Sequence, residues 1–252
     1  WRAGAESNYE LSVVVAPQSP AERDRFLEAI LFSMPPAAPY RADDVPYVPL
    51  LCRMMSELGT DTLDETAFSR TVSAQTGSLG VSTMTSAKPR PGGAAGSPDE
   101  AVAMLMLSGR AVADKAPQLF DLAADMLAST QLDNAERAGA MLTQSLARAE
   151  AAVVSSGNSY ASAALAARLS LCGSVDEMRG GVSQLHTLRG ALEQAQSDWP
   201  ALLARLERMR SALLSADGAV VNLSADEQSL ATTAAHVPRL LGRLPSAAAP
   251  SD

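Results

Sequence analysis

The sequence is poor in the residues from which most enzyme and metal sites are built. It holds two histidines and two cysteines in 252 residues. His186 and His236 are far apart in the chain, and neither belongs to an H-E-x-x-H or H-x-x-E-H sequence. A hydrolytic zinc site needs several ligands around one metal and a carboxylate that activates its water. We therefore predict no metal ligand in this chain and expect both histidines to be partly buried helix residues.

Other catalytic arrangements are missing as well. The sequence has no G-x-S-x-G turn for a serine nucleophile. Glu100, Glu177 and Glu193 are too scattered to predict a carboxylate pair. The glycosylation sequon that starts at Asn222 lies at the end of an expected strand, and we expect no glycan there. The residues alone therefore predict no catalytic, cofactor-binding or metal-binding position, and they describe a non-catalytic domain.

The two cysteines are too few for a disulfide framework. Cys52 and Cys172 both lie in apolar, helical contexts, where a thiolate is unfavourable. We expect both to be reduced core residues, which fits a reducing compartment such as the cytosol, the mitochondrial matrix or the plastid stroma.

A long apolar run and an excess of positive charge are also absent. The longest apolar stretch, Ala101 to Leu107, has the length of a strand and cannot span a membrane. The net charge is −8 and the basic residues are scattered, which argues against a nucleic-acid partner and is compatible with cationic ligands. Apolar residues make up 47% of the chain, as in proteins with a folded core. Because the chain starts at Trp1, we expect a processed product or a fragment.

The stretch from Pro46 to Ala87 has the clearest pattern. Val48, Leu51, Cys52, Met55 and Leu58 recur at helical spacing, and Gly59 follows as a stop signal. Thr62 to Glu65 reads as a capping box that opens a second helix, with Leu63, Ala67, Phe68 and Val72 buried and Gly77 as its end. Alternation from Leu79 to Thr85 then predicts a strand.

The flanking segments are expected as follows. Towards the N-terminus, the patterns predict a strand at Leu11 to Ala16, a helix from Ser19 to about Ser33 and a proline-rich linker from Met34 to Pro46. Beyond Ala87, they predict a surface loop at Lys88 to Ser97 and, at Ala101 to Leu107, a central strand that is covered on each side or at least not at an edge.

The second half of the sequence is mostly helical. We expect one helix that buries Leu119, Leu122, Ala123 and Met126. A second is expected from Asp133, its cap, to about Ser155, and a third from Tyr160 to Leu171. Ser174 to Glu177 reads as another capping box. A helix after Asp198 is expected to bury Leu202, Leu206, Met209 and Leu213, and a strand is expected from Ala219 to Leu223. A capping box from Ser224 to Glu227 then opens a last helix, which is expected to bury Leu230, Ala234, Val237 and Leu241.

These elements predict an α+β fold of two layers, with a mainly antiparallel sheet and helices on one face. We expect a divergent N-terminal segment over residues 1–45, an α+β domain over residues 46–243 and, over residues 244–252, a linker to a further C-terminal unit.

Several separated motifs lie between Pro46 and Pro245. They are PYVPLLCRMMSELGT, QTGSLGVSTMTS, LSGRAVADKAPQLFDLAADML, SSGNSYASAALAARLS, GGVSQLHTLRGALE and LLSADGAVVNLSADEQSL. In this order they make the chain resemble the presequence proteases, the organelle branch of the pitrilysin-type zinc metallopeptidases, subfamily C, and the last motif looks most like plant and algal members. Residues 1–45 do not follow the family pattern, and Asn158 stands where the family has a histidine.

The resemblance implies a metallopeptidase-like unit of the pitrilysin and mitochondrial-processing-peptidase type. In such enzymes four α+β units form two halves that close around a chamber, where unfolded peptides such as cleaved targeting sequences are degraded. The match is to the third, associated unit, whereas the zinc ligands belong to the first unit and the substrate-positioning residues to the fourth.

The resemblance therefore implies a non-catalytic part of a zinc metalloendopeptidase, inactive alone, that forms chamber wall and interface in the mitochondrial matrix or plastid stroma. Its partners would be the other units and unfolded peptides, and the zinc would lie outside this chain. The alternative is a free-standing binding or scaffold domain of the same fold.

Overall fold

The computed structural model describes residues 10–15, 27–34, 42–87, 97–214, 216 and 219–244, with the backbone alone for the first two ranges. Its strands are β1 (Glu10–Val15), β2 (Leu27–Met34), β3 (Ser78–Ala87), β4 (Ala101–Val112) and β5 (Val220–Ala225). Its α-helices are α1 (Val48–Glu57), α2 (Glu65–Gln75), α3 (Ala116–Ala128), α4 (Ala135–Ser155), α5 (Gly157–Ala166), α6 (Leu171–Gly180), α7 (Val182–Ser197), α8 (Trp199–Leu213), α9 (Glu227–Ala234) and α10 (Val237–Leu241). The 3₁₀ helices are η2 (Ala42–Tyr47) and η4 (Ala113–Lys115).

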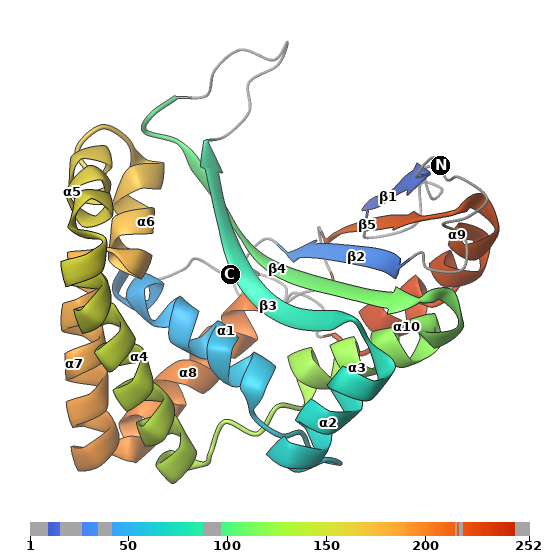
Figure 1. Cartoon of the computed structure of the whole chain (residues 1–252), viewed down its shortest axis with the longest axis horizontal. Coiled ribbons are helices and arrows are strands. Elements are labelled where there is room, and N and C mark those ends of the chain that lie inside the picture. The colour runs from blue at the N-terminus through green and yellow to red at the C-terminus, as the bar shows by residue number, and fades with distance from the viewer. Residues whose placement is uncertain are drawn as a thin grey trace, which may run out of the picture.

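The strands form one five-stranded sheet in the order β1-β5-β2-β4-β3. The β1–β5 pair is parallel, and the other three pairs are antiparallel. Helices α1, α2, α3, α8 and α10 lie on one side of this sheet, while β3 and β4 bend away together at one end (Figure 1). The expected two-layer α+β architecture with a mainly antiparallel sheet is confirmed.

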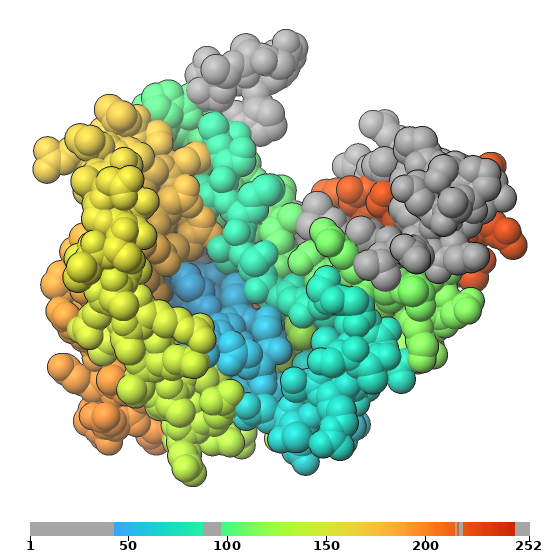
Figure 2. All heavy atoms as spheres, viewed as in Figure 1, coloured from blue at the N-terminus to red at the C-terminus, as the bar shows by residue number. Residues whose placement is uncertain are grey.

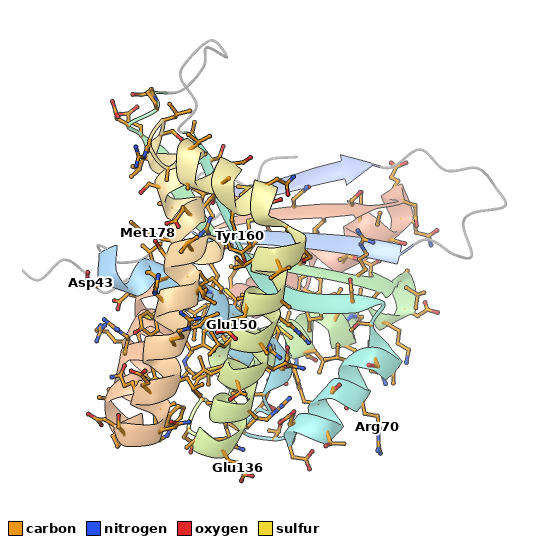
Figure 3. The ribbon with its side chains drawn as sticks, turned by 60° about the vertical axis from the view of Figure 1, so that its left-hand side comes forward. Asp43, Arg70, Glu136, Glu150, Tyr160 and Met178 are labelled. Carbon is orange, nitrogen blue, oxygen red and sulfur yellow. The ribbon has the colours of Figure 1, made fainter. Side chains whose placement is uncertain are left out.

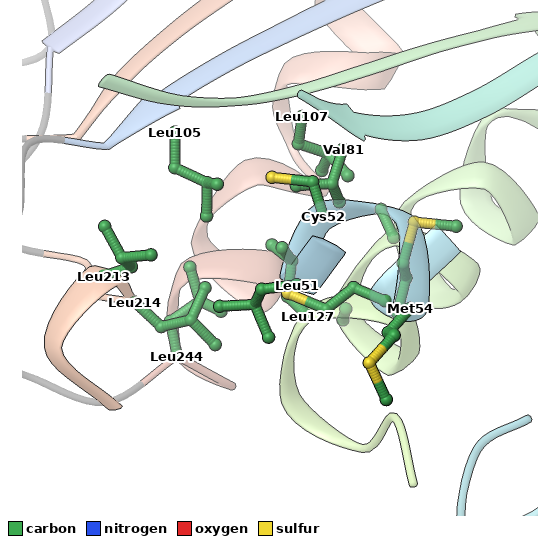
Figure 4. Close-up of a cluster of buried hydrophobic side chains, with 14 of the residues drawn as sticks. Leu51, Cys52, Met54, Val81, Leu105, Leu107, Leu127, Leu213, Leu214 and Leu244 are labelled. Carbon is green, nitrogen blue, oxygen red and sulfur yellow. The ribbon is translucent and has the colours of Figure 1, made fainter. Parts of the chain in front are cut away.

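The core lies between the sheet and these helices. Helix α1 buries the whole predicted set at 48, 51, 52 and 55, with Leu58 just beyond it, and its side chains meet those of β3, β4 and α8 in one cluster (Figure 4). The predicted faces of α3 and α8 are also buried. Helical spacing of apolar residues therefore located the inner faces correctly. Of the four residues predicted for α2, only Phe68 is fully buried.

Helices α4 to α7 lie together beside the sheet, and we call these four helices the helical hairpin. Helix α4 packs against α7 and α5 against α6, and Figure 3 shows Glu136 at one end of α4 with Tyr160 on α5 and Met178 on α6 farther along. Arg53 of α1 joins the hairpin to the core, because its Nη1 donates to the carbonyl oxygen of Met141 at 2.9 Å.

The predicted helix from Ser19 to Ser33 is wrong over its second half, because residues 27–34 form β2. Residues 19–26 lie outside the described part of the chain. Strand β2 lies inside the sheet, where Phe32 is paired with Leu107 and Val221. Hydrogen bonding to β4 and β5 on both sides outweighs the helix-start signal at Ser19, since tertiary pairing overrides local propensity. The strand predicted at residues 11–16 is confirmed as β1.

Four of the predicted helix caps are wrong by a few residues. Helix α2 is capped by Asp64 rather than Thr62, α4 by Asn134 rather than Asp133, and α9 by Asp226 rather than Ser224. The box at 174–177 lies inside α6, which Ser170 caps. The helix expected after Asp198 is confirmed as α8, and Asp198 caps it: its Oδ1 accepts a hydrogen bond from the amide of Ala201 at 3.2 Å.

Three further boundaries differ from expectation. The helix expected from Tyr160 to Leu171 ends at Ala166, and α6 starts at Leu171. Strand β4 continues to Val112 and is internal in the sheet, as expected; Met106 and Leu107, on its two sides, are both buried, whereas Ser108 and Arg110 beyond the predicted stretch are exposed. The expected single last helix is two short ones, α9 and α10. The predicted linker is wrong at both ends, because Met34 belongs to β2 and residues 42–46 to η2. Its residues 35–41, the loop residues 88–96 and the tail from 245 lie outside the described residues.

Candidate functional surfaces

The two histidines lie in different parts of the fold. His186 is exposed on α7, so the expectation that it is partly buried is wrong. His236 is half-buried just before α10, and its ring centre lies 5.7 Å from that of Phe120. Within the ranges that the structure describes, no three His, Cys, Asp or Glu side chains are grouped closely enough to hold a metal ion. The described residues therefore offer no place for zinc.

Both cysteines are free. Cys52 is buried on α1, as expected of a core residue, whereas Cys172 is only half-buried on α6. Burial raises the pKa of the Cys52 thiol to about 12, against a small opposing effect of the Arg179 charge. A thiol with such a high pKa stays protonated and is a poor nucleophile. Cys52 therefore has a structural rather than a chemical role.

The side of β3, β4 and β5 that the helices leave uncovered forms a distinct surface, which we call the outer face. The strand register places Ser82 opposite Met106 and Met84 opposite Met104 on this side. Methionine side chains are flexible and polarisable, and they are common on surfaces that accept varied partners. In the space-filling view the molecule is hollowed above the sheet, beside the upswept ends of β3 and β4 (Figure 2). The outer face is exposed at Ser82 and Met84, where it suits adaptable contacts, whereas Met106 is buried.

A second surface feature is an apolar cleft between β3, β4, α6, η2 and the end of α8. Its volume is about 400 Å³, and most of its lining is aliphatic, with Val48, Leu105, Val175 and Leu213 among the lining residues. Arg179 of α6 lies in its wall. A deep apolar cleft with one fixed polar group is the usual form of a small ligand site.

A third feature is the exposed apolar end of the helical hairpin. Leu165, Leu169 and Leu171 are all exposed where α5 turns into α6, and the amide of Leu171 donates to the carbonyl oxygen of Pro98 at 2.7 Å. Neighbouring exposed apolar groups are common on surfaces that contact another protein.

Sequence reasoning did not predict any of these three surfaces. The methionines at positions 84, 104 and 106 were a usable signal, because alternate positions of two strands place them on one side. The cleft had no such signal, because its wall combines residues from five separate segments. The structure has no helix, among the residues it describes, that is long and apolar enough to cross a membrane.

Comparison with known proteins places this chain within a larger enzyme family. The chain is 30% identical over 201 residues to presequence protease 1, chloroplastic/mitochondrial, of Arabidopsis thaliana, which covers 80% of this chain and 18% of that protein. It is 25% identical over 198 residues to the mitochondrial presequence protease of Danio rerio, covering 79% of this chain and 19% of that protein. The chain thus spans less than a fifth of either relative.

Two solved structures share the fold. One is the peptidase M16 inactive domain from Pseudomonas fluorescens, with a TM-score of 0.59 at 18% identity over 98% of this chain and 52% of that one. The other is a conserved protein from Enterococcus faecalis V583, with a TM-score of 0.57 at 15% identity over 92% of this chain and 50% of that one. The family model for the associated domain of the M16 peptidases, subfamily C, matches residues 33–190. The chain therefore belongs to this family, as a peptidase-associated domain of the presequence-protease type.

Proposed function

We propose that this chain is a non-catalytic unit of a presequence-protease-like zinc metalloendopeptidase, and that it forms part of the wall around the peptide-degrading chamber. The observation that carries the proposal is the family match over residues 33–190; among the described residues, in addition, no three His, Cys, Asp or Glu side chains are grouped to hold a metal ion. Peptide hydrolysis needs a metal-bound water and a general base. A unit without them contributes by enclosing and orienting the peptide.

The outer face is the part of this unit that we assign to the chamber. Its serines and methionines present no fixed charge pattern that would select one peptide sequence, which suits a wall that meets many unfolded peptides. Arg110 is also exposed on β4, opposite Ser78. The substrates would be unfolded peptides, including cleaved targeting sequences, and the net charge of −8 favours cationic ones.

We further propose that the chain pairs with other units of the same peptidase and acts in the mitochondrial matrix or the plastid stroma. The two relatives in sequence are named as chloroplastic/mitochondrial and mitochondrial proteins. The zinc and its ligands would belong to another unit, and this chain would hold no catalytic residue. Nucleic acid would not be a partner.

The test is a reconstitution with three samples. A cationic amphipathic peptide is incubated with this chain, with the zinc-bearing half of a presequence protease, and with the two combined. We expect no cleavage by the chain alone and faster, chelator-sensitive cleavage by the combination. Cleavage by the chain alone that a chelator stops would refute the non-catalytic role. No gain on combination, despite demonstrated association, would favour a free-standing scaffold domain.

A pair of variants tests the chamber wall directly. Met84→Glu adds a charge to the outer face, whereas Ser69→Glu adds the same charge to the exposed side of α2, among the helices on the other side of the sheet. If the outer face contacts peptides, Met84→Glu changes the KM of the combined enzyme for cationic peptides and Ser69→Glu does not. Equal effects of the two variants would show that the outer face is not part of the wall.

A further inference from the structure

The apolar cleft beneath the bent end of β3 and β4 has the form of a ligand site that the proposed function does not use. Leu105 of β4 and Leu213 of α8 lie on facing elements there (Figure 4), and Val175 of α6 also lines the space. A volume of about 400 Å³ lies within the usual range for small-ligand pockets, roughly 300–1,000 Å³. The cleft is large enough for one bulky apolar side chain with its backbone.

Arg179 supplies the polar part of this site. Among the described residues that line the cleft it is the only charged one, and its side chain is 12% exposed. One terminal nitrogen donates to Thr83 Oγ1, and the other donates to Thr85 Oγ1 and, at 2.7 Å, to Asp176 Oδ1. These contacts fix the guanidinium against the strand and leave it in the cleft wall.

The charge of Arg179 is only partly balanced. Its ion-pair partner, Asp176, is 58% exposed, and such pairs are weakened by solvent. The buried Nε of Arg179 has no acceptor among the described residues. A guanidinium carries five N–H donors, so two of them have no partner in the described part of the chain. A nearby carboxylate would therefore gain a charge-assisted contact with this guanidinium.

We propose that this cleft binds the C-terminal residue of a peptide, with the apolar side chain between Val175, Leu105 and Leu213 and the carboxylate beside Arg179. A C-terminal residue carries both groups on one Cα atom, which matches an apolar space with an arginine in its wall. An internal acidic residue carries its carboxylate on the side chain itself and leaves the apolar space unfilled. The positive charge also disfavours a basic residue at this point.

The first experiment compares two probes on the unmodified chain by methyl NMR. N-acetyl-alanyl-leucine has a free carboxylate, and its amide differs only in the loss of that charge. We expect the acid to shift the methyl signals of Leu105, Val175 and Leu213 with a dissociation constant of about 1 mM, and the amide to bind about tenfold more weakly. No binding of the acid, or equal binding of acid and amide, would overturn the proposal.

The second experiment removes the charge. Arg179→Gln should abolish the difference between acid and amide. Arg189→Gln is the matched control, because Arg189 pairs with Glu150 on the surface of the hairpin at 2.8 Å and does not line the cleft. If both variants keep the preference for the acid, Arg179 is not the carboxylate partner and the proposal fails.

A third variant keeps the test decisive if Arg179→Gln does not fold. Leu171 lines the cleft and is 45% exposed, so Leu171→Asp places a repelling charge at the cleft with little structural cost. Leu169→Asp adds the same charge at a position that is 76% exposed and outside the lining. The proposal expects Leu171→Asp to weaken binding of the acid at least about fivefold and Leu169→Asp to leave it unchanged. Equal binding by these two variants would contradict it.

Discussion

The helix-and-sheet core and the outer half of the helical hairpin are built in opposite ways. Helix α1 buries six of its ten residues, whereas α5 buries none and α6 buries only Gly173. The leucines that α5 and α6 do have lie at the exposed turn between them. The core is therefore stabilised by apolar burial within this chain, and the outer hairpin is not.

The outer hairpin is attached by close backbone contact and by polar groups instead. A side chain on Gly173 would lie 2.2 Å from the carbonyl oxygen of Ala166, which shows how closely α6 approaches the end of α5. Arg179 joins α6 to two threonines of β3, and Leu171 bonds to Pro98. The chain thus buries the apolar side chains of its core by itself and leaves those at the hairpin end exposed. This is expected if another unit covers that end.

The largest contrast is expected from truncating one leucine in each region. Leu51→Ala removes a side chain that has no exposure and should lower the free energy of unfolding by about 2–5 kcal/mol. Leu169→Ala changes an exposed side chain and should alter it by less than about 0.5 kcal/mol. Urea unfolding of both variants checks this. Similar losses would mean that the hairpin end is packed in solution.

Removing the buried charge of Asp44 should cause the next largest loss in the free energy of unfolding. Asp44 is 3% exposed, and its carboxylate lies 3.1 Å from Arg205 Nε and 3.0 Å from Arg208 Nη2. Asp44→Asn should cost about 1–3 kcal/mol, because the buried carboxylate loses its charge-assisted hydrogen bonds to two partly exposed arginines. In the control, Asp121→Asn removes a solvent-exposed pair with Arg239 and should cost less than about 1 kcal/mol. Thermal melts of the two variants would separate them, and equal melting temperatures would contradict the burial argument.

Two glycine substitutions test how the hairpin is held. Gly173→Ala places a methyl group against backbone atoms of Ala166 and should destabilise by about 1–3 kcal/mol. A methyl group on Gly190 of α7 meets no described atom within 4 Å, so Gly190→Ala should stabilise by about 0.5–1 kcal/mol, because alanine favours the helix. Hydrogen exchange over residues 157–180 measures the first effect locally. Unchanged protection there in Gly173→Ala would disprove the close approach of α5 and α6.

The smallest effect on stability near neutral pH concerns the cysteines. In the folded chain the pKa of Cys52 is about 12, above the ordinary thiol value of about 8.5. A raised pKa means that the stability from the neutral thiol is fully present below about pH 8.5 and is lost as the pH rises towards 12. At about pH 8, iodoacetamide should modify half-buried Cys172 and leave Cys52 intact until the chain unfolds. Rapid modification of Cys52 in folded protein would contradict its burial.

The helix caps show that local sequence signals locate the start of a helix only to within a few residues. Thr62 and Asp64, and likewise Ser224 and Asp226, are competing caps in one turn, and the structure uses the aspartate in each case. The sequence locates the turn, but the backbone angles that choose the capping residue depend on how the helix docks. The start of α8 after Asp198 was predicted correctly, and there a proline in the first turn agrees with the local signal.

The sequence by itself determined the inner faces of α1, α3 and α8 and the absence of a histidine-based zinc motif, because helical periodicity and ligand spacing are properties of neighbouring residues. Only the tertiary structure decided that residues 27–34 are a strand, since that depends on pairing with β4 and β5, far away in the chain. It also decided that Arg179 is hydrogen-bonded to β3 in the wall of an apolar cleft. Such juxtapositions are set by how packed elements meet, and no local pattern encodes them.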